Sequence, residues 1–229
     1  MKIGGLHKTS LIDYPGKICA IIFTQGCNFK CPYCHNPELV NPEEFSALIP
    51  EEEIFSFLEK RKKYLDAVSI TGGEPLIQKD ILEFLGKLKK LGFLIKIDTN
   101  GSLPEILQEI IEKNLVNYIS MDVKGPLEKY DLIIGVKIDT EKIKESIELI
   151  KNSNIDYEFK TTVVKKFLDE KDFIKIGQLL KGTKLYFLQK FVPTKTVNKD
   201  FLEEKTYSDE EFENIKNIMK EHVLECKIR

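Results

Sequence analysis

Residues 18–36 read ICAIIFTQGCNFKCPYCHN, an apolar run followed directly by three closely spaced cysteines. The run at residues 18–24 is short and rich in β-branched and aromatic side chains, which is typical of a β-strand. The part that follows contains Gly, Asn and Pro, residue types that favour loops. The sequence therefore predicts a strand that delivers the thiols of Cys27, Cys31 and Cys34 to a single loop.

Five more runs of this kind follow along the chain, and amphipathic segments with helical spacing of apolar residues separate them. The runs lie at residues 67–71, 94–98, 118–122, 157–163 and 185–188. Six strands that alternate with helices imply a parallel sheet with right-handed crossovers. A complete eightfold barrel takes about 250 residues. The fold class expected for this chain is therefore α/β, a partial TIM-like (β/α)6 barrel, with a doubly wound sheet as the competing topology.

No linker divides the chain, so we expect one domain over residues 1–229. Within it, we expect residues 1–17 to form a lead-in, residues 18–190 the (β/α)6 core, and residues 191–229 a C-terminal loop and helix. Pro15-Gly16 in the lead-in predicts a type II turn that brings the chain into the first strand.

Two capping-box patterns mark expected helix starts. Ser102 with Glu105, and Ser208 with Glu211, have the spacing in which the serine and the glutamate each satisfy a free backbone amide. Each pair precedes an apolar run with helical spacing. Cys226 lies just beyond the last such run, and we expect it to be helical.

Charge and hydropathy limit the classes of partner. The 35 Lys and Arg residues nearly balance the 37 Asp and Glu residues, and a net charge of -2 gives no electrostatic case for binding nucleic acid or an anionic membrane. The apolar run at residues 18–23 is far too short to span a bilayer. We therefore expect a cytoplasmic protein without nucleic-acid or membrane partners. Disulfides rarely persist in the cytoplasm, so the cysteine cluster indicates metal binding or redox chemistry.

Polar and glycine-rich segments follow the predicted strands. Residues 72–75 are Gly-Gly-Glu-Pro, residues 98–101 are Asp-Thr-Asn-Gly, and residues 122–124 are Asp-Val-Lys. Lys160 lies near the end of the fifth predicted strand. In barrels and doubly wound sheets, active sites lie at the carboxyl ends of the strands. We therefore expect these residues to gather on one rim with the cysteine loop.

Three interpretations of the cysteines are open from the residues alone. A structural zinc site normally has four protein ligands and no fourth is evident here, although a catalytic zinc keeps one position open. A glutaredoxin-like dithiol at residues 31–34 would need a helix whose N-terminus stabilises the thiolate, and Pro37 would break that helix. A [4Fe-4S] cluster held by only three thiolates would leave one iron open to a further ligand.

The spacing Cys27-x3-Cys31-x2-Cys34, with Tyr33 just before the last cysteine, resembles the signature of radical S-adenosylmethionine (SAM) enzymes. The resemblance implies a [4Fe-4S] cluster on the three cysteines, with SAM bound to the open iron. In that family an electron from the cluster cleaves SAM and releases a 5'-deoxyadenosyl radical, which abstracts a hydrogen atom from the substrate, while the protein orients the cofactor. Residues 72–75 are similar to the family's GGEP motif, which meets the SAM amino group.

Other segments resemble the glycyl-radical-enzyme activases. They are residues 34–36, 98–101 and 122–124, and residues 8–17 are similar to anaerobic ribonucleoside-triphosphate reductase activating proteins. The resemblance implies cofactor contacts from Tyr33, Asn36, Gly72, Gly73, Glu74, Asp98, Lys124 and Lys160, the last by its position alone. It also implies a monovalent cation near SAM, held by Asp98, Thr99 and Asp122.

The expected function is therefore that of a radical SAM activase, which makes a glycyl radical on a partner such as anaerobic ribonucleoside-triphosphate reductase. Only Cys19 and Cys226 lie outside the triad, so we expect one cluster and an external flavodoxin or ferredoxin as electron donor. Residues 189–191 lack the histidine that the pyruvate formate-lyase activase has near SAM after its sixth strand. The alternatives are a radical SAM enzyme that acts on a small molecule, and a cysteine-based zinc or thiol-redox protein.

Overall fold

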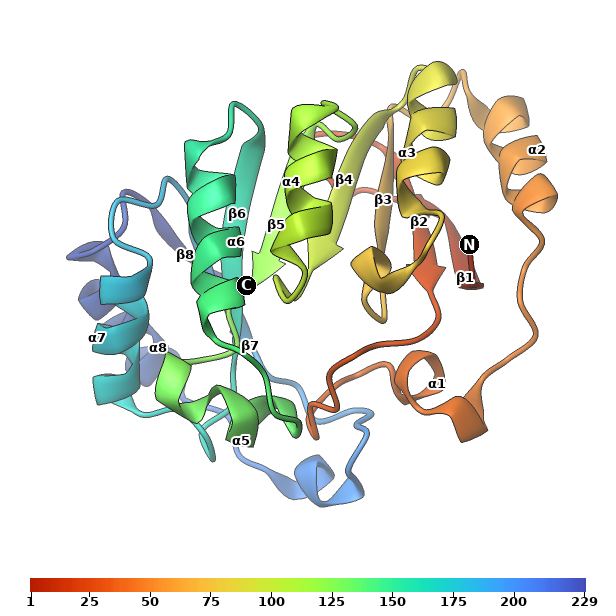
Figure 1. Cartoon of the computed structure of the whole chain (residues 1–229). Helices are drawn as coiled ribbons and strands as arrows, with labels where there is room; N and C mark the ends of the chain where they lie inside the picture. Colours follow the sequence, from red (N-terminus) through yellow and green to blue (C-terminus); the bar gives the residue numbers. More distant parts are fainter.

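Eight strands form a single curved sheet in the computed structural model, which describes residues 1–229 (Figure 1). The strands are β1 (Ile3–Ser10), β2 (Cys19–Thr24), β3 (Ala67–Gly72), β4 (Leu94–Thr99), β5 (Tyr118–Asp122), β6 (Asp156–Val163), β7 (Tyr186–Lys190) and β8 (Cys226–Ile228). They lie in the sheet in their order along the chain, and all neighbours from β2 to β8 are parallel. A doubly wound sheet would reverse its order at a switch point. The partial TIM-like barrel is therefore confirmed and the competing topology is excluded.

Eight α-helices connect the strands, and the longer ones cover the outer face of the sheet (Figure 1). The helices are α1 (Pro37–Val40), α2 (Glu51–Arg61), α3 (Ile81–Lys90), α4 (Pro104–Glu112), α5 (Tyr130–Ile134), α6 (Glu141–Asn152), α7 (Glu170–Leu179) and α8 (Asp209–Lys220). Short 3-10 helices lie at Pro42–Glu44, Pro75–Ile77, Leu127–Lys129 and Lys199–Glu203. The buried faces of the helices and strands join in one hydrophobic core of 49 residues.

The six predicted strands correspond to β2 through β7, whereas β1 and β8 were not predicted. β1 pairs antiparallel with β2 and therefore extends the sheet at its N-terminal edge. Cys226 begins β8, so the expectation that it is helical was wrong. Helix α8 ends at Lys220, and the chain then turns back beside β7, where the amide of Tyr186 donates to the carbonyl of Glu225 (2.9 Å).

One of the two predicted capping boxes is present. Ser208 and Glu211 cap α8 reciprocally, as expected. Ser102 does not cap α4, because the helix begins at Pro104, and proline suits the first helical position since it has no amide to satisfy. The predicted turn at Pro15-Gly16 fits the structure, because Gly16 has a φ of +67° and the amide of Lys17 donates to the carbonyl of Tyr14 (3.2 Å).

The inner face of the sheet is polar along β4, β5 and β6. In the strand register, Asp98 lies beside Ser120, and Asp122 lies beside Lys160. Side chains alternate between the two faces of a strand, so Ile97 packs into the hydrophobic core while Asp98 lines the inside of the barrel. The sheet thereby presents charged groups from three neighbouring strands to one interior space.

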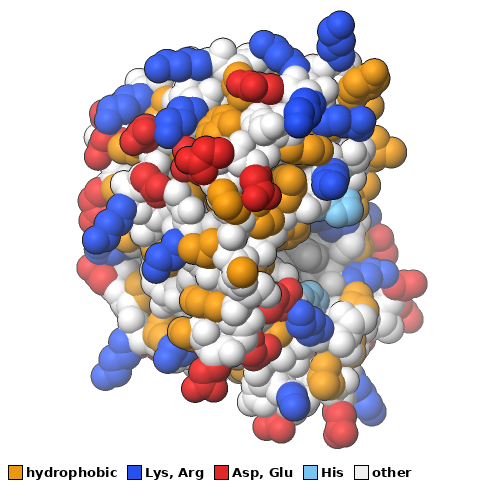
Figure 2. Space-filling view, turned by 90° about the vertical axis from the view of Figure 1, so that its right-hand side faces the viewer, with side chains coloured by type: hydrophobic (Ala, Val, Ile, Leu, Met, Phe, Trp, Pro, Cys, Tyr) orange, Lys and Arg blue, Asp and Glu red, His pale blue; other side chains and the backbone are white.

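Acidic and basic side chains are interspersed over the face of the molecule seen in Figure 2, without a large patch of one sign. Among the helices, none combines the length and the apolar character that crossing a membrane requires.

Candidate functional site

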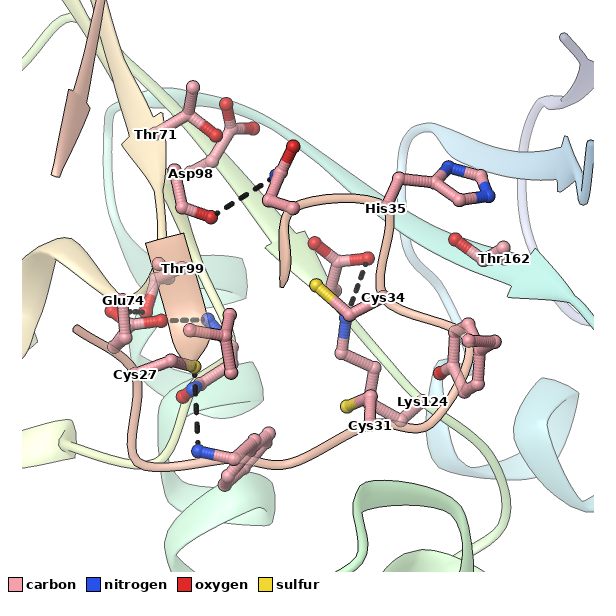
Figure 3. Close-up of a pocket in the computed structure, with 18 of the residues that line it drawn as sticks. Cys27, Cys31, Cys34, His35, Thr71, Glu74, Asp98, Thr99, Lys124 and Thr162 are labelled. Carbon is pink, nitrogen blue, oxygen red and sulfur yellow. Dashed lines mark hydrogen bonds and ion pairs between the residues drawn. The ribbon is translucent and has the colours of Figure 1, made fainter. Parts of the chain in front are cut away.

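A cavity of about 200 Å³ opens at the carboxyl ends of the strands. The loop after β2 brings Cys27, Cys31 and Cys34 to it, and the ends of β3, β4, β5 and β6 complete its walls (Figure 3). All of the residues for which the sequence predicts a cofactor or cation contact line this cavity: Tyr33, Asn36, Gly72, Gly73, Glu74, Asp98, Thr99, Asp122, Lys124 and Lys160. The fold therefore gathers five separate segments of the chain around one space.

Two segments distant in the sequence hold the cysteine loop in place. Gly135 ends α5 with a φ of +71° and lies so close to the loop that a Cβ atom there would be 2.7 Å from the Lys30 carbonyl oxygen. On the other side, the amide of Val197 donates to the carbonyl of Cys34 (3.0 Å). The cysteines are thus carried by a loop whose backbone is fixed from both sides, which preorganises them for a ligand.

The thiols do not have the properties of a redox dithiol. Burial raises the pKa of Cys27 to about 12 and that of Cys31 to about 11, and it also raises the pKa of Cys34. Glutaredoxin-like cysteines have lowered pKa values at the start of a helix. Here α1 begins only at Pro37 and has 4 residues. Both observations disfavour the dithiol interpretation.

The donor set fits an iron-sulfur cluster better than a single metal ion. No group of three or more His, Cys, Asp or Glu side chains has the arrangement needed to hold one ion. In a cubane the thiolates bind different irons, so they need not converge on one point. The ammonium group of Lys124 lies near Cys31 and Cys34 (Figure 3), and its charge favours the deprotonated thiols that metal binding requires.

The two glycines after β3 are required by a close approach of two loops. A Cβ atom on Gly73 would lie 1.9 Å from the carbonyl oxygen of Gly26, and one on Gly72 would lie 2.6 Å from the backbone of Thr24. The amides of Gly73 and Glu74 donate to the carbonyls of Thr24 (2.8 Å) and Gly26 (2.9 Å). The glycine loop therefore packs directly on the segment that leads to the cysteines, and this contact shapes the cavity.

Glu74 ties the loop after β3 to the loop after β4. Its Oε1 accepts hydrogen bonds from the Leu76 amide (3.0 Å) and the Thr99 hydroxyl (2.8 Å), and its Oε2 accepts one from the Asn100 amide (2.7 Å). Burial raises the pKa of Glu74 to about 7, although these hydrogen bonds oppose the shift. Because most of its acceptor capacity is used within the protein, Glu74 is a positioning residue in this structure.

A polar network that the sequence analysis missed joins the cysteine loop to the loop after β4. The Asn28 side chain donates to Ser102 Oγ (2.7 Å) and accepts from the Asn100 side chain (2.9 Å). Ser102 Oγ in turn donates to Asn100 Oδ1 (2.6 Å). The sequence analysis interpreted Ser102 as a capping residue of α4. For Asn28, nothing in the sequence indicated a structural role apart from its position between two cysteines. Together these side chains fix the first turn of the cysteine loop.

Charged side chains form a row across the inner faces of β4, β5 and β6. The Nζ atoms of Lys96 and Lys160 each lie 2.9 Å from Asp98 Oδ1. Lys160 Nζ also lies 3.7 Å from Asp122 Oδ2, and Lys124 Nζ lies 3.2 Å from Asp122 Oδ1. Burial alone would raise the pKa of both aspartates, but the lysines hold it below its usual range. Lys96 was not predicted, although a lysine two residues before Asp98 in an apolar strand was the available signal.

Aromatic rings form a further side of the cavity. The ring of His35 stacks on that of Phe191 with centroids 5.4 Å apart, and the ring of Tyr33 meets Phe191 edge-on at 6.4 Å. The Tyr33 hydroxyl and His35 Nε2 are buried without a hydrogen-bond partner in the protein. Buried polar atoms are normally satisfied, so these two are available to a bound molecule. Gln189 lines the cavity in the region where the sequence lacks the activase histidine.

Comparison with known proteins agrees with this geometry. The protein-family model for the Radical SAM superfamily matches residues 21–180, which include the cysteine loop, most of β2 and strands β3 through β6. The chain belongs to the radical SAM superfamily. Membership implies a [4Fe-4S] cluster and SAM as cofactors, and the free cysteines beside Lys124 fit such a group.

The radical SAM relatives of this chain include activating enzymes. A protein of Methanocaldococcus jannaschii, described as a candidate glycyl-radical enzyme activating enzyme, is 36% identical over 232 residues, covering 99% of this chain and 95% of the relative. A pyruvate formate-lyase-activating enzyme of Staphylococcus aureus is 38% identical over 106 residues, covering 43% of this chain and 42% of that enzyme.

Solved structures confirm the radical SAM fold. A domain of the pyruvate-formate lyase-activating enzyme from Bacteroides vulgatus superimposes with a TM-score of 0.58 at 16% identity, covering 71% of this chain and 98% of that domain. At this identity the likeness shows the fold alone. The chain is thus a radical SAM enzyme, and its sequence relatives place it among the glycyl-radical enzyme activating enzymes.

Proposed function

We propose that this protein activates anaerobic ribonucleoside-triphosphate reductase by generating a glycyl radical on it. The observation that carries the proposal is the placement of Cys27, Cys31 and Cys34 on one clamped loop, facing the residues that end β3 through β6. In the proposal these three thiolates hold a [4Fe-4S] cluster. Bound there, the cluster and SAM supply the one-electron cleavage chemistry needed to remove a hydrogen atom from glycine.

The chain's own residues orient SAM in this proposal. Lys124 is placed to pair with the SAM carboxylate, because its ammonium lies between the cysteine loop and Asp122. The Asn36 side chain, 3.5 Å from the Gly72 carbonyl, joins the cysteine loop to the glycine loop at the position proposed for the SAM amino group. Tyr33 and His35 supply the aromatic side and the unsatisfied polar atoms that suit an adenosine group. Gly73 and Glu74 act by holding the loops that form this site.

A single cluster and an external electron donor complete the proposal. Cys19 and Cys226 each begin a strand, so both lie at the amino ends, away from the cavity at the carboxyl ends. No other cysteines are present to hold a second cluster. A flavodoxin or ferredoxin is therefore the proposed donor. The ribonucleotide reductase is proposed as partner because residues 8–17 resemble proteins that activate it.

The test is to reconstitute the purified protein anaerobically with iron and sulfide, reduce it, and mix it with SAM and anaerobic ribonucleoside-triphosphate reductase. We expect a glycyl-radical signal in electron paramagnetic resonance and an equivalent of 5'-deoxyadenosine. In a second outcome, the protein forms 5'-deoxyadenosine but places a glycyl radical on another glycyl-radical enzyme and none on this reductase. That result would show that the other enzyme is the partner. Turnover of a small molecule without any glycyl radical would contradict the activase assignment.

A further inference from the structure

The ammonium group of Lys160 lies between the two aspartates that the sequence assigned to a monovalent cation. Lys160 Nζ is 2.9 Å from Asp98 Oδ1 and 3.7 Å from Asp122 Oδ2. Lys160 belongs to β6 and Asp98 to β4, so the lysine reaches across β5 to make this bridge. The Lys160 side chain is only 13% exposed, so most of it is shielded from solvent in this position.

The charge around the two aspartates is already balanced without an ion. Lys96 pairs with Asp98 at 2.9 Å, and Lys124 pairs with Asp122 at 3.2 Å, in addition to the Lys160 bridge. Three ammonium groups therefore contact the two carboxylates. Interactions between charges at such distances are strong where water is largely excluded. A further cation at this place would have to displace one of these ammonium groups from its carboxylate.

The hydroxyl oxygen of Thr99, the third group that the resemblance assigned to a cation, already takes part in hydrogen bonds within the protein. The Thr99 hydroxyl donates to Glu74 Oε1 (2.8 Å), and the amide of Gly101 donates to the Thr99 oxygen (3.1 Å). Thr99 therefore serves the hydrogen-bond network that ties the loops after β3 and β4. The residues Asp98, Thr99 and Asp122 do not fit a monovalent cation in this protein.

We infer that the Lys160 ammonium takes the place of a monovalent cation, so that the protein holds SAM without sodium or potassium. The inference rests on the proposed function for the identity of SAM as the ligand. The ammonium groups of Lys124 and Lys160 line the cavity, where they attract an anionic group such as the SAM carboxylate. Lys160 is thus a specificity-determining residue that sets which ions the enzyme requires.

The first test measures ion binding directly and needs neither SAM nor turnover. The reconstituted protein, with its cluster oxidised, is titrated with sodium chloride while the line width of ²³Na is followed by magnetic resonance. We expect no saturable sodium site in the wild-type protein and a new saturable site in Lys160→Ala, where the two aspartates lose their bridge. Lys181 is an exposed lysine outside the cavity, so Lys181→Ala serves as the matched control and should behave as wild type.

The second test measures SAM affinity by isothermal titration calorimetry with the cluster oxidised, so that SAM is not cleaved during the titration. Buffers contain either potassium or only tetramethylammonium, at equal ionic strength. We expect wild type and Lys160→Arg to bind SAM equally in both buffers. We expect Lys160→Ala to bind about tenfold more weakly without potassium, a typical coupling between two sites, and to regain affinity when potassium is added. Thermal unfolding of each variant shows whether it is folded, and Lys160→Met replaces Lys160→Ala if that variant unfolds.

Two results would overturn the inference. One is a saturable sodium site in the wild-type protein, or a need for potassium in wild-type SAM binding. The other is a folded Lys160→Ala or Lys160→Met variant that remains insensitive to potassium. Either result leaves the proposed function intact if SAM is still cleaved. Conversely, the wild-type protein could fail to cleave SAM while Lys160→Ala gains a sodium site. That result would contradict the proposed function and support the role of Lys160.

Discussion

Replacing Gly73 by alanine tests whether the contact between the glycine loop and the cysteine-bearing segment holds the site together. The new Cβ atom would lie 1.9 Å from the Gly26 carbonyl oxygen and 2.6 Å from its carbon, so the two backbones must move apart. Neither partner is a flexible side chain that can turn away. The separation also stretches the hydrogen bond from the Glu74 amide to Gly26, now 2.9 Å long.

The expected loss in stability follows from these two terms. Overpacking of this kind costs about 1–3 kcal/mol, and a lost hydrogen bond costs about 1 kcal/mol. The free energy of unfolding should therefore fall by about 2–4 kcal/mol. For a protein of this size that corresponds to a decrease in melting temperature of about 4–16 °C.

Thermal unfolding followed by circular dichroism under anaerobic, reducing conditions measures this change. Gly86 is the matched control, because it lies within helix α3 and a Cβ atom there would have no neighbour within 4 Å. Gly86→Ala should stabilise the protein by about 0.5–1 kcal/mol through helix propensity and chain entropy. If Gly73→Ala melted at the wild-type temperature while Gly86→Ala behaved as expected, the close approach of the two loops would not exist in solution.

Two further predictions concern carboxylates that line the cavity. Because the pKa of Glu74 is raised from 4.5 to about 7, the folded state binds its proton more tightly, and the group's contribution to stability falls as the pH rises across that window. Relative to Glu74→Gln, the wild-type free energy of unfolding should therefore fall by up to about 3 kcal/mol between pH 4.5 and pH 7 in urea denaturation, and parallel curves would contradict this. Asp98→Asn should cost about 3–5 kcal/mol at neutral pH, because it leaves Lys96 and Lys160 without their shared carboxylate. The pKa of Asp98 is held far below its ordinary value of 3.8 by these lysines, so this difference should begin to shrink as the pH falls below 3.8 and should go on shrinking toward the lower folded-state pKa. Asp209→Asn, in an exposed pair, should have a much smaller effect at every pH.

The sequence predicted the six central strands because each is a short apolar run bounded by loop-forming residues. Residues 3–10 and 226–228 lack that signal. β1 contains two glycines and several polar residues, and it is a strand because its backbone pairs with β2. β8 has only three residues and forms because the chain after α8 returns beside β7. Pairing between distant segments determines both strands, and hydrophobic periodicity does not record it.

The site was predicted as a set of residues but not as a set of contacts. The motifs identified which side chains meet at the rim, because parallel strands end on the same side of the sheet. The motifs did not show that the carboxylate oxygens of Glu74 accept hydrogen bonds from Thr99 and Asn100. They also did not show that Lys160 reaches across β5 to pair with Asp98. Such contacts depend on the strand register and on side-chain length, which become visible only once the barrel is built.

The most direct test of the central claim is to measure iron, sulfide and 5'-deoxyadenosine for the anaerobically reconstituted protein and its cysteine variants. The account predicts one [4Fe-4S] cluster per chain and reductive SAM cleavage in the wild-type protein and in Cys226→Ala. It predicts no SAM cleavage in Cys27→Ala, Cys31→Ala or Cys34→Ala. A wild-type protein that stays colourless after reconstitution, or a triad variant that still produces 5'-deoxyadenosine, would contradict it.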